Sequence, residues 1–464
     1  TRIAAADALG IGEENLSAAW HREVRAWADR LFESRSFDAV PGRRIPTGAD
    51  GMNLGPAVSP DGVFTAYFSR NEVFSLDLVI AETASGKVVR KIANGSTDRH
   101  YDELRFMNSA GTWSPDSKLF AFITVREGDD GIAIVSAESG AYERTIRIPG
   151  IQAISHLAWS PDGNSIAFSG IAGGVSDLYL YGLEDGSLVK LTDDPYSDLQ
   201  PDWSPDGTQL VFVSDRGEGT DFERYLFGPM GLASIDLSTG EIGTMRFSAD
   251  TDHVSPQFAP DGRSVYFTAS LDGVPDVYRY FPATGLLYRV TRVKTGVIGL
   301  TGLSPALSVA DRTGELVFNL FENKGYGIYT RPQTEPDDAD EVTGAEILGV
   351  EGPVWAFAAD EVVRLPSPDR TGTVDAYLDD PELGLPADLE YETADYRPAL
   401  SLANIGDVSI GIMISGGQTT VFGNVLLLFD DFLSNHLLLT AFSVNGEILK
   451  DFSAQAMYIN RERR

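Results

Sequence analysis

The sequence contains no cysteine and only 5 histidines among its 464 residues. Without cysteine the chain has no disulfide, no thiolate metal site and no cysteine nucleophile. Five imidazoles also leave little material for a zinc site that needs several histidine ligands. We therefore expect stability to come from an ordinary hydrophobic core, and we predict neither a metal site nor a cofactor.

Positive charge is scarce relative to negative charge. The chain has 36 Lys and Arg against 68 Asp and Glu, which gives a formal net charge of −32. A protein that follows a phosphate backbone needs a basic face, and docking on anionic lipid also uses one. The balance therefore argues against a nucleic-acid partner and fits a cationic or neutral one.

Long hydrophobic runs and familiar catalytic motifs are also missing. The best apolar run, Val425 to Phe442, is broken by Asp430, Asp431, Asn435 and His436, so we expect no transmembrane helix. The sequence has no Gly-x-Ser-x-Gly elbow, no phosphate-binding loop and no Asp-x-Asp-x-Asp-Gly calcium loop. We predict no catalytic residue, although groups converging from distant segments leave a hydrolase or a lyase open. The start at Thr1, without Met or a signal peptide, is interpreted as a mature product or an excised fragment.

A repeat occupies the middle of the chain. Ser-Pro-Asp-Gly or a close variant stands at residues 59–62, 114–117, 160–163, 204–207 and 259–262. We take Ser304-Pro305-Ala306 as a degenerate sixth copy. The six prolines are spaced by 55, 46, 44, 55 and 45 residues, close to the length of a propeller blade.

Each copy has the chemistry of a tight turn followed by strands. Proline presets φ, aspartate bonds back to turn amides, and glycine accepts a positive φ. About four short alternating segments follow each turn, which is typical of a propeller blade. We interpret the aspartates Asp61, Asp116, Asp162, Asp206 and Asp261 as caps of their own turns rather than as metal ligands or acid–base groups.

These features predict an all-β fold with a six-bladed β-propeller over residues 43–332. Residues 43–47 are expected to supply the outer strand of the last blade, whose other strands run from about Leu303 to Thr330. Residues 1–42 form an N-terminal helical segment with an apolar stripe at Leu16, Trp20, Val24, Trp27 and Leu31. This segment is either a cap packed on the propeller or the tail of an upstream domain.

The chain changes character after the repeat. Residues 333–395 are acidic and Pro-rich and are predicted to be a linker. Residues 396–464 contain alternating β-segments that suit either a membrane β-barrel or a half-buried sheet.

Two groups of residues are candidate binding sites. A polar set just ahead of the inner strands is expected at the channel mouth, where it would bind a cation or a peptide terminus: His156, Asp198, Gln200, Asp252 and His253. The alternative is that these groups bond only to water and turn amides. The two longest repeats carry inserts at 96–110 and 216–231, with aromatic residues that act as partner anchors or pack on their own blade: Tyr101, Phe106, Phe222, Tyr225 and Phe227.

The motif at residues 199–207, Leu-Gln-Pro-Asp-Trp-Ser-Pro-Asp-Gly, resembles the repeat of TolB-type β-propellers, and the likeness covers about residues 43–330. The arrangement is also similar to bacterial envelope proteins with an upstream peptidase-like domain and a downstream surface-antigen-type outer-membrane barrel. Residues 20–27 are similar to the closing helix of such peptidase domains, and residues 430–436 and 458–461 to the start of such barrels. The His-Glu-x-x-His motif of those peptidases is absent.

The repeat, the missing catalytic motifs and the barrel-like tail favour a non-catalytic binding and scaffolding propeller. The resemblance implies that it lies in the periplasm or outer membrane of a Gram-negative-type bacterium, with a protein partner in the cell envelope. The alternatives are a propeller enzyme, a hydrolase or lyase that uses channel-mouth His and Asp, and a propeller that gates an upstream metallopeptidase domain.

Overall fold

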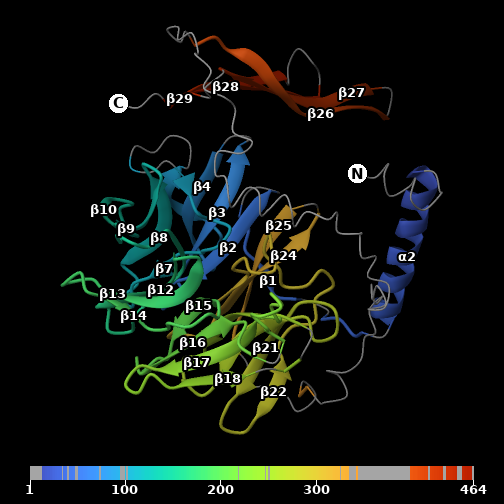
Figure 1. The fold of residues 1–464 in the computed structure, drawn as a ribbon. Helices are drawn as coiled ribbons and strands as arrows, with labels where there is room; N and C mark the ends of the chain where they lie inside the picture. Colours follow the sequence, from blue (N-terminus) through green and yellow to red (C-terminus); the bar gives the residue numbers. More distant parts are fainter. Residues whose placement is uncertain are drawn as a thin grey trace, which may run out of the picture. The chain divides into compact units, whose positions relative to one another are not determined.

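In the computed structural model the chain is all-β apart from one helix among the described residues, α2 (Glu13–Glu33) (Figure 1). The chain divides into two compact units, Thr1–Pro353 and Val354–Arg464. No described helix has the length and apolar character needed to cross a membrane. The structure describes residues 13–33, 35–38, 41–47, 51–72, 75–94, 100, 103–217, 219–245, 247–248, 251–323, 325–333, 341–342, 398–415, 418–431, 435–446 and 452–461.

Three consecutive four-stranded antiparallel meanders repeat in the middle of the chain. The first is β11 (Ala153–Trp159), β12 (Ser165–Ala172), β13 (Val175–Gly182) and β14 (Leu188–Lys190). The second is β15 (Asp198–Trp203), β16 (Gln209–Ser214), β17 (Gly231–Asp236) and β18 (Ile242–Met245). The third is β19 (His253–Phe258), β20 (Val265–Ala269), β21 (Asp276–Phe281) and β22 (Leu286–Arg289).

The sheets before and after these meanders follow the same plan with additions. The preceding sheet has two short inner strands, β6 (Glu103–Leu104) and β7 (Thr112–Trp113), both paired with β8 (Leu119–Arg126), and continues through β9 (Asp129–Ser136) to β10 (Tyr142–Ile146). An eight-stranded sheet joins β2 (Met52–Val58), β3 (Phe64–Glu72), β4 (Ser75–Glu82) and β5 (Val88–Asn94) to β23 (Leu307–Val309), β24 (Leu316–Glu322) and β25 (Gly325–Arg331).

The two ends of this region meet in the eight-stranded sheet. β1 (Arg43–Arg44) pairs antiparallel with β25, with Arg43 opposite Thr330, and β2 pairs parallel with β25 at Met52 and Tyr326. The predicted pairing of residues 43–44 with the strands before Thr330 is confirmed. No described sheet closes on itself. Neighbouring sheets contact each other through their side chains.

The repeated turns have the predicted hydrogen bonds. In the Ser-Pro-Asp-Gly copy at 59–62, Ser59 Oγ donates to Asp61 Oδ1 at 2.6 Å, and Asp61 Oδ1 also accepts the Val63 amide. The same serine–aspartate bond recurs at residues 114–116, 160–162 and 204–206. The prediction that these aspartates cap their turns is confirmed for these copies.

The sixth copy was placed wrongly by the sequence pattern. In each of the other five copies the amide of the first turn residue donates to the carbonyl five residues ahead, as Ser59 does to Phe64. The residue that makes this bond in the last sheet is Ala310, which donates to Glu315. Asp311 therefore stands where the other copies have proline, and Ser304-Pro305-Ala306 belongs to the loop ahead of β23.

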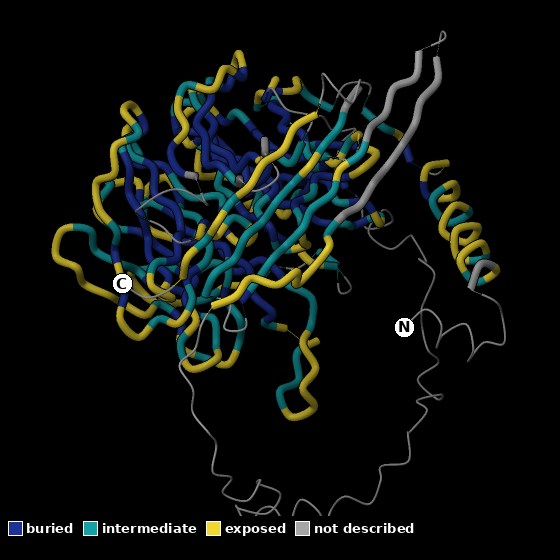
Figure 2. Tube along the Cα trace, turned by 90° about the horizontal axis from the view of Figure 1, so that it is seen from above, coloured by how far each residue is buried: buried dark blue, intermediate teal, exposed yellow. Residues whose placement is uncertain are grey.

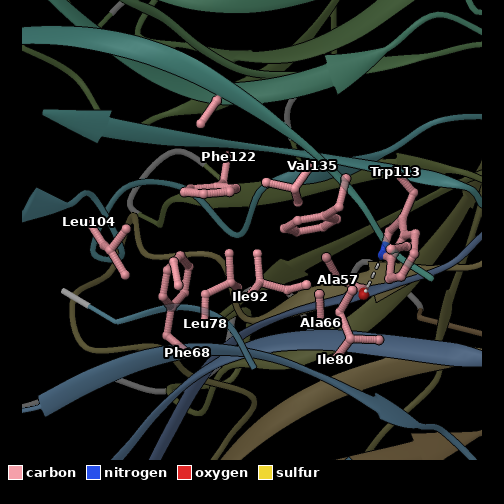
Figure 3. Packing of buried hydrophobic residues seen from close by; sticks show 14 residues of the cluster. Ala57, Ala66, Phe68, Leu78, Ile80, Ile92, Leu104, Trp113, Phe122 and Val135 are labelled. Atoms are coloured by element: carbon pink, nitrogen blue, oxygen red, sulfur yellow. Dashed lines mark hydrogen bonds between the residues drawn. The ribbon is translucent and has the colours of Figure 1, made fainter. Parts of the chain in front are cut away.

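The hydrophobic core lies between neighbouring sheets. Between the first two sheets, Phe68 and Leu78 face Phe122 and Val135, all at most 1% exposed (Figure 3). Figure 2 shows that buried residues follow the strands of this unit while exposed ones lie mainly in its turns. Alternating apolar residues in each strand thus fill the spaces between sheets.

The N-terminal segment is attached to the same unit beyond the helix. Leu31 is buried beside Gly273, and the Arg35 guanidinium forms ion pairs with Asp272 and Asp276. The Asp38 amide donates to the Arg292 carbonyl at 2.9 Å. Upstream, Trp20 and Val24 of the predicted apolar stripe remain exposed, so only the end of α2 packs as a cap.

The second unit contains a four-stranded antiparallel meander. Its strands are β26 (Ser401–Ser415), β27 (Gln418–Asp430), β28 (His436–Gly446) and β29 (Phe452–Asn460). Of the predicted linker the structure describes residues 333 and 341–342, and the Val342 amide donates to the Leu287 carbonyl in β22.

Candidate functional site

Six inner strands border a series of cavities, which we call the channel. β2, β7, β11, β15, β19 and β23, or the turns that follow them, all contribute residues to a cavity of about 330 Å³, which we call the turn-side cavity. A smaller middle cavity of about 80 Å³ shares Ala57, Leu157 and Gln257 with it and also includes His156 and Gln200. His156 also lines an insert-side cavity of about 400 Å³. The shared residues place the three cavities in series.

Hydrogen bonds join each inner strand to the next around this channel, and we call each of these six strand-to-strand contacts a junction. At four junctions a side chain accepts the amide of the following strand, with Thr112 bonding to Trp159, Asp202 to Phe258, Gln257 to Val309 and Ser308 to Val58. The equivalent residues at the other two junctions are alanines, and there the next strand's tryptophan donates Nε1 to the alanine carbonyl. These bonds are Trp113 to Ala57 at 2.9 Å (Figure 3) and Trp203 to Ala158 at 3.1 Å.

The turn-side cavity has apolar walls and two unusual acids. Its rim holds the five turn prolines and, at the sixth equivalent position, Asp311. Asp202 is the one carboxylate among the six residues that occupy the junction positions. Trp113, Trp159, Trp203 and Phe258 complete the lining.

The pKa values of these two acids are raised, whereas those of three turn aspartates are lowered. Burial raises the pKa of Asp202 well above its usual range, and the Asp311 charge raises it further. Burial also raises the pKa of Asp311 to about 6, although its exposed surface means that solvent screens this effect. In the turns, the serine hydrogen bond lowers the pKa of Asp116, Asp162 and Asp206. Asp202 and Asp311 were not identified as candidate site residues from the sequence. Each is an acid at a position of the repeat where none of the other copies has an acid, and this difference can be seen in the sequence.

Two of the predicted channel-mouth residues line the middle cavity. His156 and Gln200 both have a left-handed backbone, with φ of 50° and 55°, where β2 has Gly55. Gln200 donates Nε2 to the Leu303 carbonyl at 2.8 Å and accepts the Ser255 amide, so it crosslinks three segments. Burial lowers the pKa of His156 to about 4, so its imidazole is neutral near neutral pH and is a weak base there.

The other three predicted members lie elsewhere, which corrects the expectation of one polar ring. Asp198 is buried and ion-paired with Arg216. His253 is fully buried against Phe247 and Phe267. Asp252 is exposed and accepts the Met230 amide.

The reason for this correction is a bulge in the inner strands. The pairing register shifts between Leu199 and Asp202 in β15 and between Val254 and Gln257 in β19. A bulge redirects the side chains on its two sides. Asp198, which precedes the bulge, therefore packs into its sheet, whereas Asp202 lines the turn-side cavity.

Both inserts border the insert-side cavity. The first contributes Leu104, Phe106 and Met107, the second contributes Met230, and the walls are completed by Leu199 and Leu303. Phe106 is half-buried and packs against Phe68, with ring centroids 6.2 Å apart. The predicted partner residue Tyr101 lies outside the described residues.

The second insert ends in an ordered tip with exposed apolar side chains. Asp221 and Leu226 exchange two backbone hydrogen bonds of 2.8 and 3.0 Å. Phe222 is half-buried and packs edge-on against Tyr196. Tyr225 is 81% exposed and Phe227 66% exposed, and with Leu226 they define the insert tip.

Among the described residues, no group of three or more His, Asp or Glu side chains is arranged to hold a metal ion. The described site therefore offers an acidic, aromatic cavity at one end of the channel and an apolar surface beside the inserts.

Comparisons with known proteins agree with the repeat. Residues 108–223 match the family model described as TolB beta propeller domain. The chain is 29% identical over 227 residues to an uncharacterized peptidase, YuxL, of Bacillus subtilis, which covers 48% of this chain and 30% of that protein. It is 28% identical over 150 residues to dipeptidyl-peptidase 5 of Porphyromonas gingivalis, which covers 30% of this chain and 21% of that protein.

Among solved structures, TolB from Acinetobacter baumannii matches with a TM-score of 0.44 and 18% identity over 60% of this chain and 65% of that one. The chain spans less than a third of the length of the two peptidases that it resembles. The match to the family model, together with the repeated meanders, shows that the chain contains a TolB-like β-propeller domain.

Proposed function

We propose that this chain is a binding and scaffolding propeller of a bacterial cell-envelope protein, and that it contacts a protein partner through its insert tip. The observation that carries the proposal is the exposure of Tyr225, Leu226 and Phe227 on a loop whose backbone is fixed by hydrogen bonds. Ordered exposed aromatic residues contribute large contact area at little entropic cost, which is typical of interface anchors.

The proposal includes a six-bladed architecture closed by β1. Its support is the hydrogen bond at each of the six junctions between inner strands, including Ser308 to Val58 between the last and the first. The pairing of Arg43 with Thr330 would then act as the closure. A rigid ring of this kind holds the insert tip in a fixed orientation.

The envelope location rests on the resemblance of the flanks. We propose that α2 is the end of an upstream peptidase-like domain and that β26–β29 begin an outer-membrane barrel, which places the propeller in the periplasm. Intact-mass measurement of the protein from its native source tests this placement. A mass well above 50.2 kDa in the outer-membrane fraction supports it, whereas a detergent-independent species of 50.2 kDa contradicts it.

The binding role is tested by photo-crosslinking in the native bacterium. A photoreactive amino acid replaces Phe227 in one strain and Val63, which is 48% exposed on the first repeated turn, in another. We expect one dominant crosslinked envelope protein from position 227 and none from position 63. Equal products from both positions, or no dominant product, would contradict the proposal.

A second candidate is a propeller that gates or docks a peptidase domain elsewhere in the same protein. It is favoured by the two relatives named as peptidases, of which this chain covers 30% and 21%. The lowered pKa of His156 makes its imidazole a weak general base. Peptide turnover by the isolated chain that is lost in His156→Ala or His253→Ala would instead establish a propeller enzyme.

A further inference from the structure

The turn-side cavity departs from the symmetry of the repeat at two positions. Five of its six rim positions are proline, and the sixth is Asp311. The turn at Ala310 keeps the same backbone bond to the residue five ahead as the other copies do. The turn therefore does not require a proline there, and nothing in its hydrogen bonding requires an acid.

The Asp311 carboxylate has no structural task among the described residues. The turn aspartates each accept a serine hydroxyl or a backbone amide, as Asp61 does from Ser59 and Val63. No such bond to Asp311 is present in the described part of the chain, where the neighbouring Arg312 pairs with Asp61 at 3.5 Å. The carboxylate is thus available to a molecule that enters the cavity.

Asp202 provides a second carboxyl on the same cavity. Its Oδ2 accepts the Phe258 amide at 2.7 Å, and glutamine, serine and threonine accept the equivalent amide at three of the other junctions. An amide or hydroxyl would therefore satisfy the fold, so the junction does not need an acid at this position. Both acids line the same cavity, and the Asp311 charge raises the pKa of Asp202, so a cation bound between them would relieve their repulsion.

The remaining walls indicate which cation fits. A divalent metal needs about six to eight oxygen ligands, and no described group of three acidic or histidine side chains is arranged to hold one. The cavity is instead lined largely by proline, alanine and aromatic residues, and its one described cation, Arg312, is already paired with Asp61. The aromatic residues are Trp113, Trp159, Trp203 and Phe258. Aromatic rings combined with carboxylates recognise organic ammonium groups. A volume of about 330 Å³ suits a small ligand or a side chain.

We propose that the turn-side cavity is a binding site for an alkylammonium group, with Asp202 and Asp311 as its counter-ions and the aromatic residues as its walls. The ligand class is a primary amine on an alkyl chain, as in a diamine or a lysine side chain. This site lies at the opposite end of the cavity series from the inserts. A test of amine binding here is therefore independent of a test of partner binding at the insert tip.

The test measures binding of cadaverine to the full chain by calorimetry and by the fluorescence of the cavity tryptophans, at about 0.15 M salt to screen surface charge. Asp311→Pro restores the residue found in the other five copies, and no described backbone bond uses the Asp311 amide, so this variant should fold. We expect Asp311→Pro and Asp202→Asn each to weaken binding about tenfold, as loss of one charged contact does.

The matched control is Glu143→Gln, which removes one negative charge from the exposed strand β10. This variant should bind cadaverine as the parent chain does, and 1-pentanol, which lacks the charge, should not bind. The proposal is overturned if the parent shows no saturable binding, or if the double variant Asp202→Asn/Asp311→Pro binds equally well. Calcium that binds alone and displaces cadaverine would overturn the assignment to an organic cation.

Discussion

The strands between Met52 and Arg331 and those between Ser401 and Asn460 use similar alternating sequences, but they reach different degrees of burial. In the propeller region Phe122 and Phe212 are 0% exposed. In the C-terminal sheet Phe442 is 37% exposed and Ile405 is 55% exposed, although neighbouring strands pair along most of their length. Figure 2 shows the same contrast along the two sets of strands.

The difference shows that strands can be paired through their backbones without burying their side chains. Cross-strand hydrogen bonds satisfy the backbone in both regions, but a sheet buries its faces only when another layer covers them. In the propeller region each sheet is covered by the next, and the junction bonds hold the sheets together. Both faces of the described C-terminal strands carry leucine, since Leu427 and Leu428 alternate along β27.

The largest expected effect comes from truncating a side chain between propeller sheets. Phe122→Ala removes a fully buried ring and should lower the free energy of unfolding by about 3–5 kcal/mol. Phe442→Ala in the C-terminal sheet should leave the same transition unchanged. Denaturant unfolding followed by tryptophan fluorescence measures this, because Trp113, Trp159 and Trp203 lie in the propeller region. Equal losses would mean that the two regions unfold as one.

The next effect concerns the segment that follows α2. Arg35→Ala leaves the fully buried Asp276 without its closest cation, which should cost about 3 kcal/mol. Arg43→Ala, an exposed residue of β1 that donates to the Ala84 carbonyl, is the matched control and should cost less than about 1 kcal/mol. Thermal unfolding of both variants measures the difference. A cost for Arg35→Ala as small as that of the control would show that the segment does not stabilise the propeller region.

Much of the propeller region could be predicted from the sequence, because its information is local. The turn at residues 59–62 needs only four adjacent residues, and the alternation in Ser165–Ala172 is visible along a single strand. The pairing of β1 with β25 was also predictable, from the constant distance between an outer strand and the next turn.

The channel was harder to predict because its geometry depends on the bulges. The shift of register at Leu199 to Asp202 directs Gln200 and Asp202 to the channel and leaves Asp198 within the sheet. Spacing alone placed His253 beside His156, whereas the former is enclosed by aromatic rings. The sixth turn was missed because Asp311 replaces the proline that marked the others, and the same replacement forms the acidic site.

A smaller effect is expected from breaking one junction bond. Gln257→Ala removes the acceptor for the Val309 amide and should cost about 1 kcal/mol. Ser443→Ala removes the hydroxyl contact with Ser453 in the exposed C-terminal sheet and should cost nothing in the propeller transition. Thermal unfolding compares the two variants. If Gln257→Ala is neutral, side-chain packing rather than the junction bonds holds neighbouring sheets together.

The smallest effect is a difference in pH dependence. Asp202 has a raised pKa when folded, so the folded state holds a proton that the unfolded state releases above about pH 4. Stability from this group is therefore present at low pH and is lost as pH rises through the folded pKa. Asp202→Asn, which keeps an acceptor for the Phe258 amide, should raise the midpoint of thermal unfolding at pH 8 relative to the parent and change it little at pH 4.

Asp206→Asn is the control with the opposite sign. The Ser204 hydroxyl lowers the pKa of Asp206, so its stabilising effect is present above the unfolded pKa and is lost as pH falls. This variant should therefore lower the midpoint at pH 8 more than at pH 3. If both variants lowered stability equally at pH 8, Asp202 would be another turn-type acid that the fold uses in its charged form. Opposite signs would separate the acids that the fold uses in their charged form from an acid that the fold does not use in that form.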